Sequence, residues 1–271
     1  MTSDQASKRH EAACDAGAHT YADPHSGYQA FTRVGLLARG SCCGAGCRHC
    51  PYHHESVALE KRPRVMQQPA WLTDARPQSC NRVCCLFWSG GKDSYLAYRA
   101  LQRSYDCEIV LMTTFDRSSG VIAHQELPIE TIVYQAQYLG LPLVGVPLFG
   151  DMDYAVRVVQ ALTLIPQTSC LAFGDLHLTH IRKWREDTFD REGSMGHLEL
   201  LFPLWQQPYE ALLEDLTDSG VCCKVSAVTA QATGIQVGDV FDRAFVANLP
   251  AGVDPFGERG EFHTEVVFDE H

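Results

Sequence analysis

Residues 83–101, VCCLFWSGGKDSYLAYRAL, constrain the fold of this chain more than any other segment. Residues 83–88 form an apolar run that is too short to span a membrane and is typical of a strand buried on both faces. Gly90 and Gly91 follow the run, and glycine allows both a sharp turn and a close approach of the backbone to a ligand. The residues after them have a helical pattern. The segment therefore predicts a strand, a tight turn and a helix.

The turn has the composition of an anion-binding loop. The first backbone N–H groups of a helix have no partner within the helix, and the positive end of the helix dipole lies beside them. Two serine hydroxyls and one lysine would add to the attraction for a phosphate group. The loop is not a Walker A motif, because the Gly-x4-Gly-Lys-Ser/Thr spacing is absent. The residues predicted to bind phosphate groups are Ser89, Gly90, Gly91, Lys92, Asp93 and Ser94.

Residues 81–271 alternate strand and helix patterns, which predicts an α/β fold with a doubly wound, mostly parallel sheet. Further strands are expected at 108–115, 141–146, 169–173 and 221–228, and helices at 127–139, 152–164, 176–191 and 208–219. Ligands of such sheets bind beyond the carboxyl ends of the strands. Thr113 and Thr114 are therefore candidates for lining a nucleotide pocket, with ordinary strand-end residues as the alternative. Asp175, after another strand, is expected in the same crevice.

The N-terminal part divides into three segments. Residues 1–20 are polar and show no periodicity, which predicts a disordered tail. Residues 21–62 predict a small Cys-rich module, and residues 63–80, with three prolines, predict a linker. A chain of 271 residues is long enough for one large domain and such a module.

The Cys-rich module has the pattern of a metal site. Its centre, RGSCCGAGCRHCPYHH, holds four cysteines in nine residues, with interleaved glycines that let the chain wrap around a centre. Four thiolates, or three with a histidine, would satisfy tetrahedral zinc or an iron–sulfur cluster, and both remain open. A cluster of reduced thiols is the alternative. The candidate ligands are Cys42, Cys43, Cys47 and Cys50, with His49, His53 and His54 as candidate nitrogen donors.

Charge and composition limit the kinds of partner that the protein is expected to bind. The formal net charge of −11 argues against a broad basic surface for nucleic acid or membranes. The first residues lack the apolar core of an export signal, and no apolar run approaches the length of a membrane span. Disulfides are therefore not expected among the twelve cysteines. We expect a cytoplasmic protein with no membrane partner.

Polar residues also gather near the C-terminus. Residues 254–268, DPFGERGEFHTEVVF, place Glu258, Glu261, His263 and Thr264 among glycines. Such a loop can bind a cation or a polar substrate, and we expect it to lie over the crevice, near Asp175 and the SGGKDS loop. A solvated surface hairpin is the alternative.

These motifs together resemble a known family. SGGKDS is similar to the SGGxDS signature of the PP-loop in the ATP pyrophosphatase superfamily, and the order of the motifs resembles the diphthine–ammonia ligase family. Phe256 and Arg259 depart from that family's pattern, which has Cys and Asn there. The motifs that carry the resemblance are SGGKDS at 89–94, TTF at 113–115, His124, FGD at 173–175, Arg182, Glu186, PLW at 203–205 and GERGEFHT at 257–264.

The resemblance implies an adenine nucleotide alpha hydrolase-like fold and a two-step amidation. ATP would be split between its α and β phosphates, and the adenylated carboxylate of a modified histidine on an elongation factor would be opened by ammonia. Lys92 and Mg2+ would stabilise the leaving pyrophosphate, and Asp93 or Asp175 would hold the metal. Glu261 and His263 would position the acceptor or the ammonia.

Two other functions remain open. Some PP-loop enzymes with Cys-rich clusters transfer sulfur to tRNA, and the cysteine cluster favours this reaction, whereas the acidic balance and the GEFHT block count against it. A non-catalytic nucleotide-binding regulator with a zinc module is the second alternative. Pyrophosphate release separates an enzyme from a binder, and sulfur incorporation separates the two enzymes.

Overall fold

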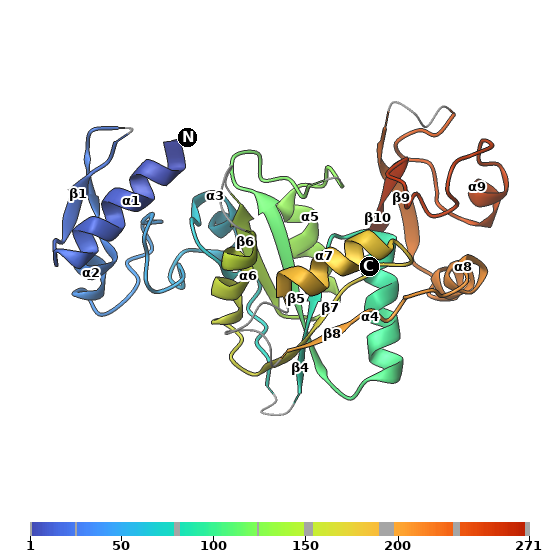
Figure 1. The fold of residues 1–271 in the computed structure, drawn as a ribbon, viewed down its shortest axis with the longest axis horizontal. Coiled ribbons are helices and arrows are strands. Elements are labelled where there is room, and N and C mark those ends of the chain that lie inside the picture. Colours follow the sequence, from blue (N-terminus) through green and yellow to red (C-terminus); the bar gives the residue numbers. More distant parts are fainter. Residues whose placement is uncertain are drawn as a thin grey trace.

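The computed structural model describes residues 2–24, 26–78, 82–123, 125–148, 154–189, 198–229 and 234–268. A central α/β domain lies between an N-terminal module and a C-terminal lobe, which project to opposite sides of it (Figure 1). Among the described helices, none is both long and apolar enough to cross a lipid bilayer.

The centre of the fold is a mixed six-stranded sheet with the order β3-β6-β5-β4-β7-β8. Five strands are parallel, and β3 pairs antiparallel with β6 at one edge. The chain runs outward from β4 through β5 to β6, then returns to β7 and β8 on the other side of β4. The order therefore reverses between β4 and β7, which is consistent with the predicted doubly wound fold. The strands are Ala70–Trp71 (β3), Val83–Phe87 (β4), Glu108–Asp116 (β5), Leu143–Leu148 (β6), Thr168–Ala172 (β7) and Glu199–Leu201 (β8).

Helices cover both faces of the sheet, and this explains the continuous apolar runs of its strands. One face packs against α4 (Lys92–Ser104) and α5 (Ile129–Tyr138), and the other against α6 (Tyr154–Leu162) and α7 (Thr179–Phe189). Alternation along β4 places Leu86 in the first core and Cys85 in the second. Cys84, Cys85, Cys170 and Cys223 are buried, as expected for small core residues.

The segment predicted as a linker, 63–80, is instead part of the fold where the structure describes it. It contains most of α3 (Arg62–Val65) and the edge strand β3. Met66 and Leu72 are fully buried, and Leu72 packs so closely on Gly145 that a Cβ there would lie 2.5 Å from its Cδ1. Three prolines predict a linker here, but burial of a few apolar side chains holds the segment against the central sheet.

The predicted disordered tail is also structured, because α1 (Thr2–Asp15) occupies most of it. Ala6 and His10 on this helix are buried, and the ring of His10 stacks on His49 at 3.6 Å. Only a narrow stripe of the helix is covered, so its sequence shows little apolar periodicity. The module also contains β1 (Thr20–Ala22), β2 (Gln29–Phe31), α2 (Arg33–Leu37) and the 3-10 turn η1 (Leu59–Lys61).

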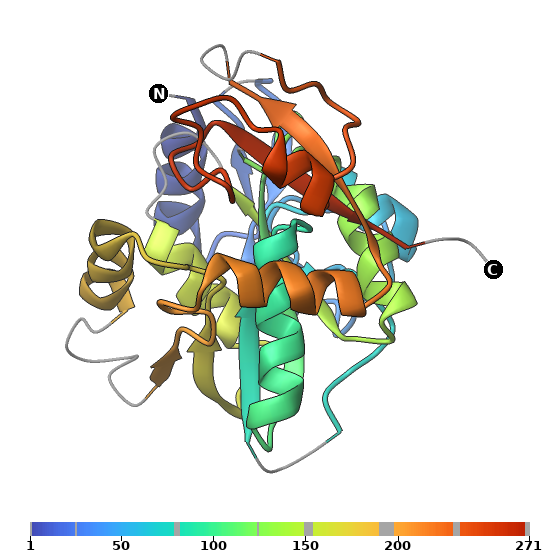
Figure 2. The ribbon, with the colours of Figure 1, turned by 90° about the vertical axis from the view of Figure 1, so that its right-hand side faces the viewer.

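The C-terminal lobe is built on a two-stranded antiparallel ribbon that is separate from the main sheet. The strand expected at 221–228 is present as β9 (Cys222–Val228), and it pairs with β10 (Phe262–Val267). Figure 2 shows α8 (Tyr209–Asp218) crossing in front of α4, with the ribbon lying over the first turn of α4. The lobe also contains α9 (Arg243–Ala247). The ribbon thereby reaches the loop after β4.

Candidate functional site

The glycine loop joins β4 to α4 at the point where the strand order reverses. Gly90 has a φ of +83°, a conformation that L side chains rarely adopt, and Gly91 is the N-cap of α4. A Cβ on Gly90 would lie 2.5 Å from Ile132 Cδ1, and one on Gly91 would lie 2.8 Å from the Thr264 carbonyl oxygen. Both glycines are therefore needed for close packing as well as for the turn.

Hydroxyl groups surround the loop. Ser94 Oγ donates to the Gly91 carbonyl at 2.9 Å and lies 3.4 Å from Ser89 Oγ. The Thr113 hydroxyl is buried beside the sheet's carboxyl edge and has no hydrogen-bond partner. Its neighbour Thr114 lies on the other face of β5, so the structure does not bring the two threonines together. Gln125, whose Oε1 also lacks a partner, approaches Ser89 Oγ at 3.5 Å.

Lys92, which the sequence predicts as a phosphate-binding residue, is buried. Its side chain is 3% exposed, and its Nζ lies 2.9 Å from Asp93 Oδ2. Three aromatic rings surround the ammonium group at 5.2, 5.5 and 5.9 Å from Nζ to the ring centroids; they belong to Phe256, Phe241 and Phe262. The nearest ring is thus that of Phe256, one of the two residues that depart from the diphthine–ammonia ligase pattern. Cation–π attraction and the ion pair hold the lysine inward.

Carboxyl groups gather around this ion pair. Burial raises the pKa of Asp93, and its ion pair with Lys92 opposes the shift. Burial and the charge of Asp93 raise the pKa of Glu258 to about 8. Asp93 Oδ1 is buried and has no partner. The site therefore holds one neutral acid and one carboxylate oxygen that is available to a ligand.

Asp175 is fixed by Arg185, with Nε–Oδ2 at 2.6 Å and Nη2–Oδ1 at 3.2 Å. Arg182 and Glu186, which belong to the same set of family-like motifs as Asp175, pair with each other at 2.8 Å. The Arg182 guanidinium also lies over the rings of Phe202 and of Trp205, the tryptophan of the PLW segment. Arg185 was missed, although its position three residues after Arg182 places it on the same side of α7.

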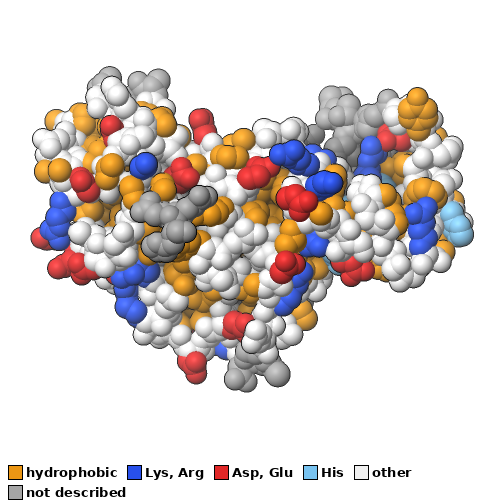
Figure 3. Space-filling model, turned by 180° about the vertical axis from the view of Figure 1, so that it is seen from behind, with side chains coloured by type: hydrophobic (Ala, Val, Ile, Leu, Met, Phe, Trp, Pro, Cys, Tyr) orange, Lys and Arg blue, Asp and Glu red, His pale blue; other side chains and the backbone are white. Residues whose placement is uncertain are grey.

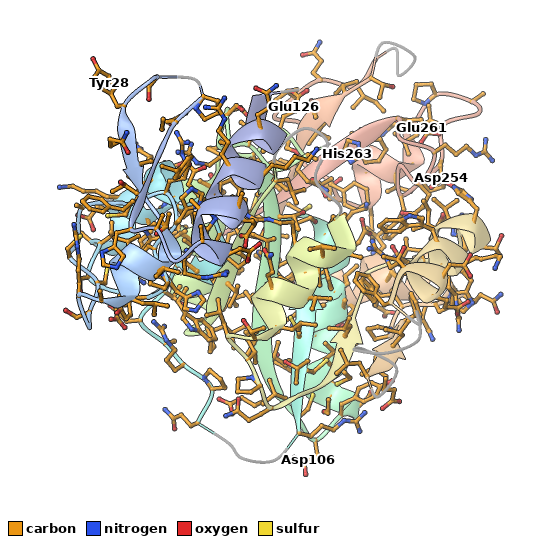
Figure 4. All side chains as sticks on the ribbon, turned by 60° about the vertical axis from the view of Figure 1, so that its left-hand side comes forward. Tyr28, Asp106, Glu126, Asp254, Glu261 and His263 are labelled. Atoms are coloured by element: carbon orange, nitrogen blue, oxygen red, sulfur yellow. The ribbon has the colours of Figure 1, made fainter. Side chains whose placement is uncertain are left out.

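The C-terminal block lies against the glycine loop, but it reaches the loop through Glu258 and Thr264 and not through Glu261 and His263. Thr264 Oγ1 accepts the backbone N–H of Lys92 at 3.1 Å, and Glu258 lies near Asp93. Glu261 instead accepts the backbone N–H groups of Asp254 at 2.9 Å and Arg259 at 3.1 Å. Figure 4 shows Asp254 and Glu261 close together in the C-terminal lobe. Glu261 therefore stabilises the turn between Asp254 and Arg259.

His263 lies on the other face of β10 from Phe262 and Thr264, which are buried against the loop. The structure thus does not bring His263 to Lys92 on the same side of the ribbon. Sequence reasoning missed another polar cluster: Tyr209 Oη is 3.1 Å from both carboxylate oxygens of Asp254 and 3.1 Å from His177 Nδ1. His124 lies outside the described residues.

The four cysteines predicted as metal ligands belong to the N-terminal module, on the opposite side of the central sheet from the C-terminal lobe (Figure 1). Within the part of the chain that the structure describes, no group of three or more Cys, His, Asp or Glu side chains is arranged to hold a metal ion. On the face seen in Figure 3, Lys and Arg side chains are interspersed with Asp and Glu, without a continuous basic surface.

The fold and the site define an α/β protein with a glycine-rich strand–turn–helix loop at the reversal of strand order. A model of the family described as "Family of unknown function (DUF5522)" matches residues 9–56, which include the Cys-rich centre. A solved structure, "The crystal structure of predicted subunit of tRNA methyltransferase from Methanocaldococcus jannaschii DSM", is similar at 19% identity with a TM-score of 0.33. The match covers 69% of this chain and 96% of that chain.

Proposed function

We propose that this chain is an ATP-dependent ligase of the diphthine–ammonia ligase type. It would adenylate an acceptor carboxylate, release pyrophosphate, and replace AMP with ammonia to form an amide. The observation that carries the proposal is the SGGKDS loop at the reversal of strand order, beside two buried polar atoms without partners, Asp93 Oδ1 and Thr113 Oγ1. Buried polar atoms are normally paired, so unpaired ones beside a helix N-terminus support a polar ligand there.

The charges of the site suit an anionic nucleotide, although several acids surround the loop. Asp93 is paired with Lys92, and Asp175 is paired with Arg185. Glu258 is mainly protonated near neutral pH because its pKa is raised to about 8. The positive end of the α4 dipole then acts on a phosphate group without a cluster of bare carboxylates opposing it.

Mg2+ fits the donors of this site. Magnesium is usually held by one or two carboxylates together with substrate phosphates, so a ready-made three-carboxylate cage is not required. Asp93 supplies the free oxygen. We prefer Asp93 to Asp175 as the metal ligand, because both oxygens of Asp175 are engaged by Arg185. When bound, the ion would neutralise the phosphate oxygens.

Ammonia attack needs a proton acceptor, because ammonium carries no lone pair. Near neutral pH a minority of molecules carry Glu258 deprotonated, and a carboxylate with a pKa of about 8 can then take one proton from ammonium and leave ammonia. Glu258 is therefore the candidate base for the second step. Glu261 would act indirectly by holding the loop that carries Glu258, and His263 could contact the protein acceptor from the outer face of β10.

The products of ATP test the proposal. With ATP labelled at the α-phosphate, ammonium and an elongation factor that carries the carboxylate form of the modified histidine, we expect AMP and pyrophosphate. Ser94→Ala, at the loop, should lower this activity, whereas Ser104→Ala, at the far end of the same helix, should not. ADP and phosphate as products would contradict the proposal. Sulfur incorporation into tRNA without amidation would favour the sulfurtransferase, and nucleotide binding without turnover would favour the regulator.

A further inference from the structure

The four cysteines at the centre of the N-terminal module lie as two separate pairs. The Sγ–Sγ distance is 3.7 Å for Cys43 and Cys47, and 3.8 Å for Cys42 and Cys50. All four are free thiols. Within the described residues, no group of three or more Cys, His, Asp or Glu side chains is arranged around one point where it could hold an ion. The thiols are therefore placed two by two, which suits thiol–disulfide chemistry.

The turn between Cys43 and Cys47 is built to keep their thiols close. Gly44 and Gly46 have φ values of +73° and +68°, which fold the intervening residues tightly. A Cβ on Gly44 would lie 2.9 Å from the carbonyl oxygen of residue 56, so the turn is packed against the rest of the module. A disulfide needs about 2 Å between its sulfur atoms. A small rotation of the two side chains is therefore enough to join them.

Cys43 has the surroundings of a reactive thiol. Its side chain is exposed, so a small molecule in solution can reach the sulfur. The Arg39 side chain donates to Cys43 Sγ from Nη1 at 3.7 Å, and the Ala45 N–H donates to the same sulfur. The Arg39 guanidinium is itself held over the ring of Phe31, with 4.3 Å from Cζ to the ring centroid. A cation and a backbone donor beside a thiol favour the thiolate, which is the form that attacks a disulfide.

The two pairs differ in access. Cys47 is only partly buried and lies directly behind the exposed Cys43, so it is placed to react second. In the other pair, Cys50 is buried, and its sulfur accepts two backbone N–H groups that follow it in the chain. The Cys42–Cys50 pair therefore has the same spacing without an exposed thiol that lies beside a cation.

We propose that Cys43 and Cys47 form a redox-active dithiol whose co-substrate is a small disulfide such as glutathione disulfide. The Cys43 thiolate attacks one sulfur of the small disulfide, a mixed disulfide forms, and the first small thiolate leaves. Cys47 loses its proton to water and attacks the Cys43 sulfur, which forms the protein disulfide and releases the second small thiolate. Both small thiolates take up protons, so two electrons and two protons pass from the dithiol to the small disulfide.

The protein disulfide would be transient. Disulfides that form in reducing compartments are usually redox-sensing or catalytic, because small thiols there reverse the two steps. An excess of reduced glutathione should therefore restore the two thiols.

Peptide mapping of the full-length chain tests the pair. The reduced protein is treated with glutathione disulfide, quenched with an alkylating reagent and digested with trypsin. Trypsin cleaves on both sides of residues 40–48, which hold three of the four cysteines. We expect an internal disulfide in that peptide and an alkylated Cys50 in the next one. Cys42→Ser should keep the internal bond, whereas Cys43→Ser should lose it.

Trapping of the mixed disulfide separates the roles of the two thiols. Cys47→Ser lacks the second thiol, so it should hold one glutathione on Cys43, and Cys43→Ser should hold none in the same time. Cys14→Ser, in α1 of the same module, is the control and should behave as the parent protein. In the Cys47→Ser background, Arg39→Gln should slow the attachment of glutathione severalfold near neutral pH, whereas Arg33→Gln, which breaks a pair with Glu11, should not.

Several outcomes would overturn the proposal. They are a Cys42–Cys50 bond that forms first, glutathione on a cysteine other than Cys43, and no reaction of the folded chain. A bound metal ion that blocks the reaction until a chelator removes it would overturn it as well. The result is separate from the pyrophosphate assay, because the glycine loop and the cysteines lie in different parts of the chain.

Discussion

The hydroxyl of Thr264 accepts the backbone N–H of Lys92 at 3.1 Å across 172 residues of sequence. This bond satisfies one of the first N–H groups of α4, which have no partner within the helix. Next to it, the Val266 N–H donates to the Gly90 carbonyl at 2.9 Å. β10 therefore forms one wall of the glycine loop, and the conformation of the loop depends on the C-terminal lobe.

Removing the Thr264 hydroxyl should destabilise the loop. Thr264→Val keeps the shape of the side chain but leaves the buried Lys92 N–H without an acceptor, which costs about 1–3 kcal/mol. Thr264→Ser keeps the acceptor and should remain close to the parent protein. Urea unfolding measures the difference. Equal stability of the valine and serine variants would show that the hydrogen bond contributes nothing.

Lys92→Met should be strongly destabilising, because it leaves the Asp93 carboxylate buried without its cation. Breaking one side of a buried ion pair costs about 3–5 kcal/mol. The double variant Lys92→Met/Asp93→Asn should recover part of the loss, since it removes the unpaired charge as well. Thermal and urea unfolding report the effect. Lys183→Met breaks an exposed pair and serves as the control; a comparable loss there would contradict the role of burial.

The stability of the protein should depend on the protonation of Glu258. Its pKa is about 8 in the folded protein, against 4.5 for an ordinary glutamate, so between these values the folded state holds a proton that the unfolded state lacks. The free energy of unfolding should therefore fall as the pH rises from about 5 to 8, by less than about 1.4 kcal/mol per pH unit.

Glu258→Gln removes this contribution, so its unfolding free energy should fall less over the same pH range. Urea unfolding at several pH values measures it. Glu210→Gln, at the exposed start of α8, is the matched control and should follow the parent protein. Identical pH profiles for Glu258→Gln and the parent would show that Glu258 is not protonated in the folded protein.

Glu261→Gln should lower acceptor-dependent turnover while leaving ATP affinity nearly unchanged. Each carboxylate oxygen of Glu261 accepts one backbone N–H, whereas the amide of glutamine has only one acceptor oxygen. One of the two hydrogen bonds is therefore lost, and a bond of this kind to a charged group contributes about 1.5 kcal/mol. A tenfold fall in rate follows if that energy is used in the transition state. Initial rates of pyrophosphate release and calorimetric ATP binding separate the two effects. Glu265→Gln on the same strand is the control; a matching loss of ATP affinity would contradict the assignment.

Local sequence was sufficient to predict the glycine loop and most of the order of strands and helices. The loop was readable because two glycines follow a buried apolar run, and every residue involved is a neighbour in the chain. The strand at 221–228 was also predicted, but its pairing with β10 was not. A ribbon that joins distant segments leaves no short-range signature, so only its tertiary partners reveal it.

The direction of long side chains was beyond prediction. Lys92 lies inward because three phenylalanines between residues 241 and 262 surround its ammonium group, and no local pattern connects them to the loop. Asp175 follows the strand end as expected, but its partner Arg185 was not predicted. The prolines of residues 63–80 predict a linker, but contacts with β6 and its neighbours bury Met66 and Leu72, and no local pattern shows those contacts.

The contact between β10 and the glycine loop can form only late in synthesis on the ribosome. The strand, turn and helix of the loop emerge early, but the Lys92 amide gains its Thr264 acceptor only after 172 further positions along the chain. Nascent chains that stop short of residue 264 lack this wall of the loop. A truncated product would therefore carry the glycine motif without the contact that completes the loop.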